Sequence, residues 1–265
     1  MRRLIRILLL QSITAVSLFS GDLTITYKVK KSAMMGLVSD TGAIVEYHSS
    51  RHKRVSDQKD QTDIIYDYND FIRYTIDHEK KIIRKFALEA VIKCREMINQ
   101  AAKEAGDSVK IVQGFGDMSK TTVKKDGVEV ILNRKCDKRV ISMGKLNAKS
   151  SVDPDLAPPV PQGDKVAMLR DIPFSIMPNY ADTFGNFFDL VSQRGIPLKS
   201  TVEMPIGTLT LKTSIEATEI VEGAIPDSVF TLPKSYAMED EEKKEIEKIT
   251  EQIKNAEQIK NAGKK

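Results

Sequence analysis

Apolar and polar residues alternate along much of this chain, which is the pattern of half-buried β-strands. The clearest example is residues 23–30, where every second residue is apolar. Residues 63–68 and 71–77 flank an Asn-Asp pair and predict a hairpin. Further strands are predicted at residues 43–55, 82–83, 109–113, 120–124, 128–133 and 139–143, and the longest strand signal covers residues 198–218 with a turn at 205–207. Because the alternation leaves one sheet face polar, it indicates an antiparallel sheet.

Two segments show the three- and four-residue apolar spacing of helices. The first spans residues 86–105 and is followed by Gly106, a suitable C-cap. The second spans residues 179–194 and carries an aromatic stripe made of Phe184, Phe187 and Phe188. Since an apolar sheet face has to be covered, we expect both helices to pack on it. An Asp-Gly pair, Asp126-Gly127, predicts a hairpin turn between two of the strands.

The first twenty residues have the layout of a secretory signal peptide. Arg2, Arg3 and Arg6 form a basic region, and the apolar segment 7–19 follows it. We expect cleavage near Ser20, no membrane span in the mature chain, and a periplasmic or secreted protein. An uncleaved anchor is the alternative.

The composition changes at residue 239, so residues 21–238 are expected to form a single domain. The tail, residues 239–265, carries eight acids and seven bases, and the hexapeptide of residues 251–256 is repeated at 257–262. A repeat of six does not match a heptad, so a coiled coil is poorly supported. We expect a solvated helix or a disordered tail that is dispensable for folding.

Charge and motif content exclude several functions. Without the three N-terminal arginines, 38 basic residues face 37 acidic ones, so nucleic-acid binding has no electrostatic basis. No motif for nucleotide binding, metal-dependent proteolysis or a nucleophilic serine occurs, and no catalytic residue or cofactor is expected. His48 and His52 would share a face with Glu46 on one continuous strand, but the neighbouring basic residues disfavour a metal site.

The only two cysteines are Cys94 and Cys136. Export to an oxidising compartment favours a disulfide between them, which would stabilise the fold by about 4 kcal/mol. Two buried free thiols are the alternative.

Several segments resemble a family of secreted bacterial proteins, domain-of-unknown-function family 4412. Residues 23–29, 62–68 and 74–78 resemble its first sheet. Residues 131–137 resemble its Gly-Tyr-Lys-Cys segment, with Asn133 and Arg134 standing where Gly-Tyr is usual.

The end of the chain is similar to the lipoprotein-localisation group typified by LolA and LolB, at residues 195–198, 225–230 and 232–236. The resemblance covers residues 21–236. It implies an α+β, LolA/LolB-like fold, in which a curved antiparallel sheet forms an incomplete β-barrel around an apolar cavity under two main helices. It transfers no catalytic residue.

Two hypotheses follow. The first is a non-catalytic envelope protein that binds an apolar ligand, namely an acyl chain, a lipoprotein or a peptide, in the half-barrel. The second is a structural or interaction protein of the envelope with a solidly packed barrel and no ligand. For the first, the expected ligand-binding residues are Tyr74, Ile76, Phe184, Phe187, Phe188, Leu209 and Leu211.

Overall fold

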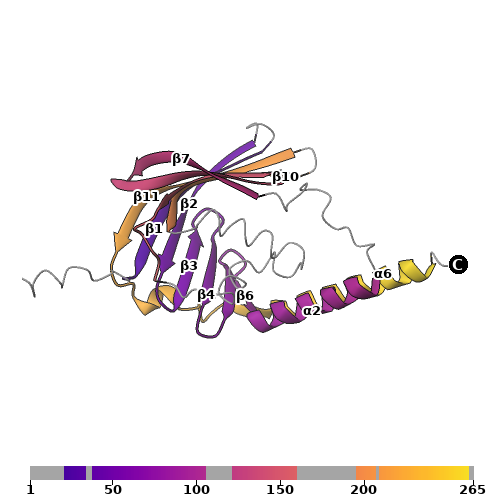
Figure 1. Ribbon diagram of the computed structural model, residues 1–265. Coiled ribbons are helices and arrows are strands. Elements are labelled where there is room, and N and C mark those ends of the chain that lie inside the picture. The colour runs from indigo at the N-terminus through magenta and orange to yellow at the C-terminus, as the bar shows by residue number, and fades with distance from the viewer. Residues whose placement is uncertain (1–20, 34–37, 106–120, 160–194, 207–208, 263–265) are drawn as a thin grey trace, which may run out of the picture.

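The described strands, twelve in all, form one large, strongly curved sheet in the computed structural model of the protein (Figure 1). The structure describes residues 21–33, 38–105, 121–159, 195–206 and 209–262. The first half of the sheet comprises β1 (Leu23–Ala33), β2 (Val38–His48), β3 (His52–Asp57), β4 (Thr62–Asp67), β5 (Ile72–Asp77) and β6 (Ile82–Ala87). The later strands are β7 (Thr121–Ile131), β8 (Arg134–Met143), β9 (Leu146–Asp153), β10 (Ile196–Ile206), β11 (Leu209–Glu222) and β12 (Ala237–Asp240).

The strand order is β12-β6-β5-β4-β3-β2-β1-β11-β10-β9-β8-β7. Strands β1 to β6 form one antiparallel meander, and strands β7 to β11 form the second half of the sheet as another. The two halves meet where β1 pairs with β11. The short 3₁₀ helix η2 (Asp227–Phe230) lies between β11 and β12. The two helices that the structure describes are α2 (Leu88–Ala105) and α6 (Glu241–Ala262).

The expected fold class is wrong in two respects. The sheet is mixed rather than wholly antiparallel, because β12 joins β6 in parallel. The helices also do not cover the sheet as a pair. The bounds of α2 nearly match those of the predicted helix 86–105, but α2 and α6 run side by side and project from one edge of the sheet (Figure 1). The predicted helix 179–194 lies outside the described residues.

The direction of the two helices follows from the strands that precede them. β6 passes directly into α2, and β12 passes directly into α6. Since β6 and β12 are parallel, the two helices leave the sheet side by side in the same direction. The backbone N–H of Ala87 donates a hydrogen bond of 2.7 Å to Glu242 Oε1 at this point. α6 contacts α2 and buries Ile249, so this part of the tail packs on the body instead of forming the fully solvated helix expected from its charge.

The turns between β3 and β6 follow a ten-residue repeat in the sequence. Asp57, Asp67 and Asp77 each begin a turn, and the Oδ1 atom of each accepts a hydrogen bond from a backbone N–H two or three residues later. Each turn ends four residues after its aspartate at a residue with positive φ, namely Gln61, Phe71 and Lys81. These aspartates therefore fix three successive turns of one conformation.

The predicted hairpin turn at Asp126-Gly127 is wrong. β7 runs through this point with a shift of register between Lys125 and Val128, and Gly127 adopts a φ of 92° there. The turn lies instead at Leu132 and Asn133, whose φ values are 50° and 62°. Because Ile131 pairs with Arg134, this is a two-residue hairpin loop with both central residues left-handed, which matches the twist of the strands.

Paired residues of antiparallel strands point to the same face, so the register divides the sheet into two faces. We call inner the face that carries Leu23, Ile25 and Tyr27, because the curl of the sheet packs it against a core from the second half. That core comprises Ile131, Cys136, Leu156, Ile196, Leu198 and Ala217. A second inner cluster joins Tyr66 and Phe86 to the first turn of α2.

The outer face is covered by a C-terminal strap, residues 224–240. Leu232 and Tyr236 of the strap pack on Ile65, Ile76 and Ile83.

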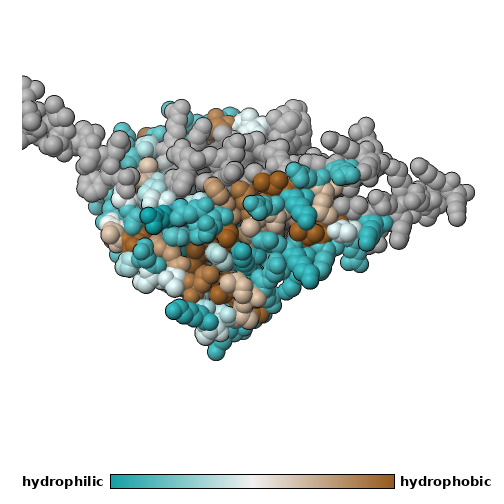
Figure 2. Space-filling model, turned by 90° about the horizontal axis from the view of Figure 1, so that it is seen from below, coloured by the Kyte–Doolittle hydropathy of each residue, from teal (hydrophilic) through white to brown (hydrophobic). Residues whose placement is uncertain are grey.

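The lower end of the molecule shows apolar groups interrupted by hydrophilic ones (Figure 2). No described helix is long and apolar enough to cross a membrane.

Cys94 and Cys136 are both buried and are not joined to each other, so the predicted disulfide is not formed in this structure. Cys94 lies on α2, next to β6, whereas β8, which carries Cys136, lies near the opposite end of the strand order. Burial, together with the charges of Asp153 and Glu129, raises the pKa of the Cys136 thiol to about 11.

The state of these cysteines can be counted. We expect two labelled thiols per chain when the unreduced protein is unfolded in denaturant with a maleimide, and slow labelling of both in the folded protein, because both side chains are buried. Mass spectrometry of the labelled protein gives the count. A count of zero would restore the disulfide.

The contact between α6 and the rest of the fold can be tested at Ile249, whose exposed fraction is 3%. We expect Ile249→Ala to lower the free energy of unfolding by about 3 kcal/mol, because it removes a buried branched side chain. Urea denaturation measures this change. Lys254→Ala, at an exposed position of the same helix, is the control and should leave stability unchanged. Equal stability of the two variants would show that α6 adds nothing to the fold.

Candidate functional site on the inner face

The inner face changes character along β1. At one end Leu23, Ile25 and Tyr27 are almost completely buried in the packed core. Further along the same face, in β10 and β11, Val202 and Met204 are half-buried and Leu211 is 41% exposed. The apolar surface of the inner face is therefore packed at one end and open at the other.

A buried polar group interrupts the inner face at β2 and β3. His48 Nε2 lies 2.9 Å from Glu46 Oε2, and Lys53 Nζ lies 3.1 Å from the same oxygen. Burial alone would raise the pKa of Glu46, but the Lys53 ammonium and the hydrogen bond from His48 hold this pKa well below its ordinary value. Glu46 is therefore ionised, and the Lys53 ammonium balances its negative charge inside the protein.

His48 is neutral in this arrangement. Burial lowers its pKa, although the hydrogen bond to Glu46 opposes that effect. Since Nε2 faces a carboxylate, it carries the proton, and Nδ1 is left as an acceptor. Nδ1 is buried and has no hydrogen-bond partner among the described residues.

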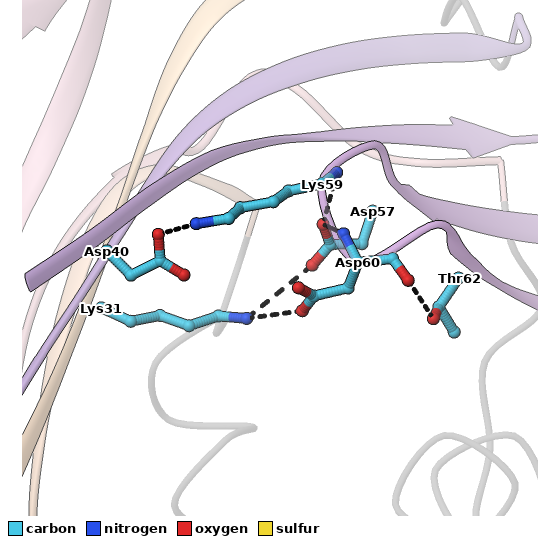
Figure 3. Close-up of polar contacts among 6 residues, drawn as sticks. All are labelled: Lys31, Asp40, Asp57, Lys59, Asp60 and Thr62. Carbon is cyan, nitrogen blue, oxygen red and sulfur yellow. Dashed lines mark hydrogen bonds and ion pairs between the residues drawn. The ribbon is translucent and has the colours of Figure 1, made fainter. Parts of the chain in front are cut away.

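The opposite end of β1 and β2 carries a second polar group, drawn in Figure 3. Lys31 Nζ lies 3.2 Å from Asp60 Oδ2 and 3.8 Å from Asp57 Oδ2, and Lys59 pairs with Asp40. These side chains line a small hollow together with Val29, Gly42 and Ile44. Most of them are about half exposed, so their ion pairs contribute little to stability and are screened by salt.

The outer face holds a polar clasp that the sequence analysis did not identify. Asp63, 2% exposed, accepts hydrogen bonds of 2.5 Å from Arg54 Nη2 and from His78 Nε2. His78 Nδ1 accepts one of 3.0 Å from the hydroxyl of Tyr236, and Arg54 Nη1 donates to the carbonyl of Val229. The clasp joins β3, β4 and β5 to the strap, so its role is structural.

The two histidines expected on one face are separated. Ser49 accepts hydrogen bonds from the backbone of Arg51 and His52 and forms a turn, so that β2 ends at His48 and β3 begins at His52. His48 lies on the inner face, whereas His52 stacks on Phe230 of the strap with ring centroids 5.1 Å apart. No group of metal-binding residues is found among the described residues.

The structure disperses the described residues of the expected ligand site. Tyr74 and Ile76 lie on the outer face, where the strap covers them. Leu211 lies on the inner face and is exposed, and Leu209 begins the same strand. Phe184, Phe187 and Phe188 lie outside the described residues. Which residues share a face is decided by the pairing of β1 with β11, two strands nearly 200 positions apart in the sequence. The local alternation of apolar and polar residues does not reveal this pairing.

Comparison with known proteins identifies fold likenesses only. No family matches the sequence, family 4412 included, and no curated protein matches it. An uncharacterised conserved protein from Thermus thermophilus has 6% identity and a TM-score of 0.44, over 84% of this chain and 92% of that one. The Pseudomonas aeruginosa MucA/MucB complex matches with 10% identity and a TM-score of 0.40, over 82% of this chain and 57% of that one.

A LolA superfamily protein from Nitrosomonas europaea has 8% identity and a TM-score of 0.33, over 84% of this chain and 97% of that one. Solved structures that resemble the chain therefore include a LolA superfamily protein. None of these likenesses shows a family.

The clasp predicts a dependence of stability on pH. Burial of Asp63 would raise its pKa, but hydrogen bonds from Ser56, His78 and Arg54 lower it below the ordinary value. A lowered folded-state pKa contributes stability above the ordinary pKa and loses it as the pH falls through the folded value. We expect Asp63→Asn to lower the free energy of unfolding by about 3 kcal/mol at neutral pH.

The difference between Asp63→Asn and the parent protein should shrink as the pH falls below about 4. Urea denaturation at several pH values measures both effects. Asp126→Asn, at an exposed position on β7, should unfold like the parent protein. A destabilisation that is the same at pH 3 and pH 7 would contradict the ionised clasp.

Proposed function

We propose that this chain is an exported, non-catalytic envelope protein that binds a ligand with an apolar body on the inner face of its sheet. The observation that carries the proposal is the change along that face from a packed core to half-buried and exposed apolar residues. Val202, Met204 and Leu211 belong to the open part. Apolar surface that continues inward from an opening is the usual lining of a site for small apolar ligands.

The second candidate is a structural or interaction protein of the envelope without a ligand. It is favoured by the packed end of the barrel, where Leu23, Ile25 and Leu198 are at most 2% exposed. The pair of helices that projects from the sheet also fits this candidate. The two candidates differ in whether the open part of the inner face takes up an apolar molecule.

Uptake can be measured with methyl parinarate, a neutral acyl probe whose fluorescence rises in apolar surroundings. We expect saturable binding, weakened about tenfold in Leu211→Gln, because a contacting leucine contributes roughly 1.5 kcal/mol or more when buried by a ligand. Val221→Gln is the matched control: Val221 lies on the same strand, is 51% exposed and faces outward.

Absence of saturable binding to the parent protein would contradict the proposal and favour the second candidate. Equal weakening by both variants would contradict the inner face as the site. Thermal unfolding of both variants checks that the substitutions leave the fold intact, as expected for two exposed positions.

A further inference from the structure

β7 forms one edge of the sheet and is exposed along most of its length. It is the last strand in the strand order, so β8 is the only described strand that pairs with it. Every residue from Thr121 to Val128 is exposed, and Val123 and Val130 have exposed fractions of 43% and 69%. Because no described strand lies on the other side of β7, the backbone N–H and C=O groups on that side are open to a further strand.

The segment Thr121–Lys125 is the regular part of this edge. Its five residues pair with β8 in unbroken register, and the register shift lies beyond Lys125. Val123 pairs with Ile141, and Ile141 pairs with Ala148. The exposed fractions along this row are 1% for Ala148, 0% for Ile141 and 43% for Val123. A residue of an added strand opposite Val123 would therefore cover an apolar side chain that the sheet leaves exposed.

The same edge has unbalanced positive charge. Strands β7, β8 and β9 carry seven basic and four acidic residues. Lys124 and Lys125 are exposed and have no ion pair among the described residues. Both acidic side chains of β7, in contrast, already bind residues of β8 or β9. The charge that remains available to a partner of this edge is therefore positive.

Lysines and bulges are also the means by which natural sheets prevent their edges from pairing with one another. β7 has both, namely Lys124, Lys125 and the register shift that follows them. Such charges discriminate between partners, because they repel a strand that brings a positive residue and attract one that brings an acidic residue. The two lysines therefore favour an added strand of opposite charge.

We propose that the segment Thr121–Lys125 binds an extended acidic segment of another protein by antiparallel strand addition. In this register two consecutive acidic residues lie opposite Lys125 and Lys124, and a branched apolar residue lies opposite Val123. Main-chain hydrogen bonds supply affinity, and the three side chains of β7 select the sequence. Three strands separate β7 from β11, which carries Leu211, so this inference goes beyond the proposed function and does not depend on it.

The probe is a fluorescein-labelled peptide, Thr-Ile-Thr-Glu-Glu-Val-Thr-Ile-Thr, whose binding to the full-length protein is measured by fluorescence anisotropy. A matched peptide has Lys-Lys in place of Glu-Glu. We expect saturable binding of the acidic peptide and about tenfold weaker binding of the lysine peptide, because two attractions become two repulsions. Equal binding of the two peptides, or no saturable binding of the acidic one, would overturn the inference.

Reversing the charge of the edge should reverse the preference. In the double variant Lys124→Glu/Lys125→Glu, the lysine peptide should bind more tightly than the acidic one. The matched control is Lys28→Glu/Lys30→Glu, which changes the net charge equally at two exposed positions of β1, inside the sheet. This control should keep the preference of the parent protein. Retention of that preference in the β7 variant, or its reversal in both variants, would contradict binding at β7.

Hydrogen–deuterium exchange distinguishes strand addition from simple attraction of charges. Bound acidic peptide should slow the exchange of backbone amides in residues 121–125, because the amides on the open side gain hydrogen bonds. Binding without such protection would overturn strand addition. If thermal unfolding shows that the β7 variant does not fold, the two peptides and the exchange of the parent protein decide. A dimer of the parent protein that dissociates in a folded β7 variant would make a second copy the occupant, which would also overturn the inference.

Discussion

The pairing of β1 with β11 is the contact on which the rest of the structure depends. It joins residues 23–32 to residues 212–222, and no other strand pair in the described part of the chain connects the first meander to the second. Forming it closes a very long loop, which is entropically unfavourable and slow. In return, every row of the inner face continues from one half of the molecule to the other. The row of paired residues Val29, Ile215 and Ser200, for example, exists only because of this register.

A sheet of this size must solve two different burial problems. Its outer face is apolar around Ile65, Ile76 and Ile83, and the strap covers it. Its inner face is packed against itself at one end and open at the other. Charge is placed accordingly: Asp63 is fully partnered under the strap, while the charge of Glu46 on the inner face is balanced by Lys53 and Glu46 also accepts a hydrogen bond from the neutral His48. Paired in this way, the buried charges remain compatible with a stable fold and a defined register.

Local structure was largely predictable from the sequence, because it depends on neighbouring residues. The strand at residues 23–30, the hairpin at 63–77 and the helix at 86–105 all correspond to observed elements. The Asp-Gly pair did not mark the turn. Gly127 lies inside β7 at a shift of register, and the chain turns instead at Leu132 and Asn133, which both adopt left-handed conformations. The ten-residue spacing of Asp57, Asp67 and Asp77 is a sequence signal for the three turns, which the alternation of apolar residues alone does not reveal.

The candidate site was less predictable, for a physical reason. Alternation shows that Tyr74 and Ile76 lie on the same face of the sheet. It does not show whether Leu211 lies on that face or on the opposite one. That choice is made by long-range register, which places Tyr74 and Ile76 under the strap and Leu211 on the inner side.

The strap also orders events in time. Arg54, Asp63 and His78 come early in the chain, whereas their partners lie far along it: Val229 comes 175 residues after Arg54, and Tyr236 comes 158 residues after His78. Until the strap has been synthesised, the first meander has to exist with an uncovered apolar face and a carboxylate without its full set of partners. Such an intermediate is a suitable client for a chaperone that recognises exposed β-structure, and its lifetime is set by the time taken to synthesise the chain as far as the strap.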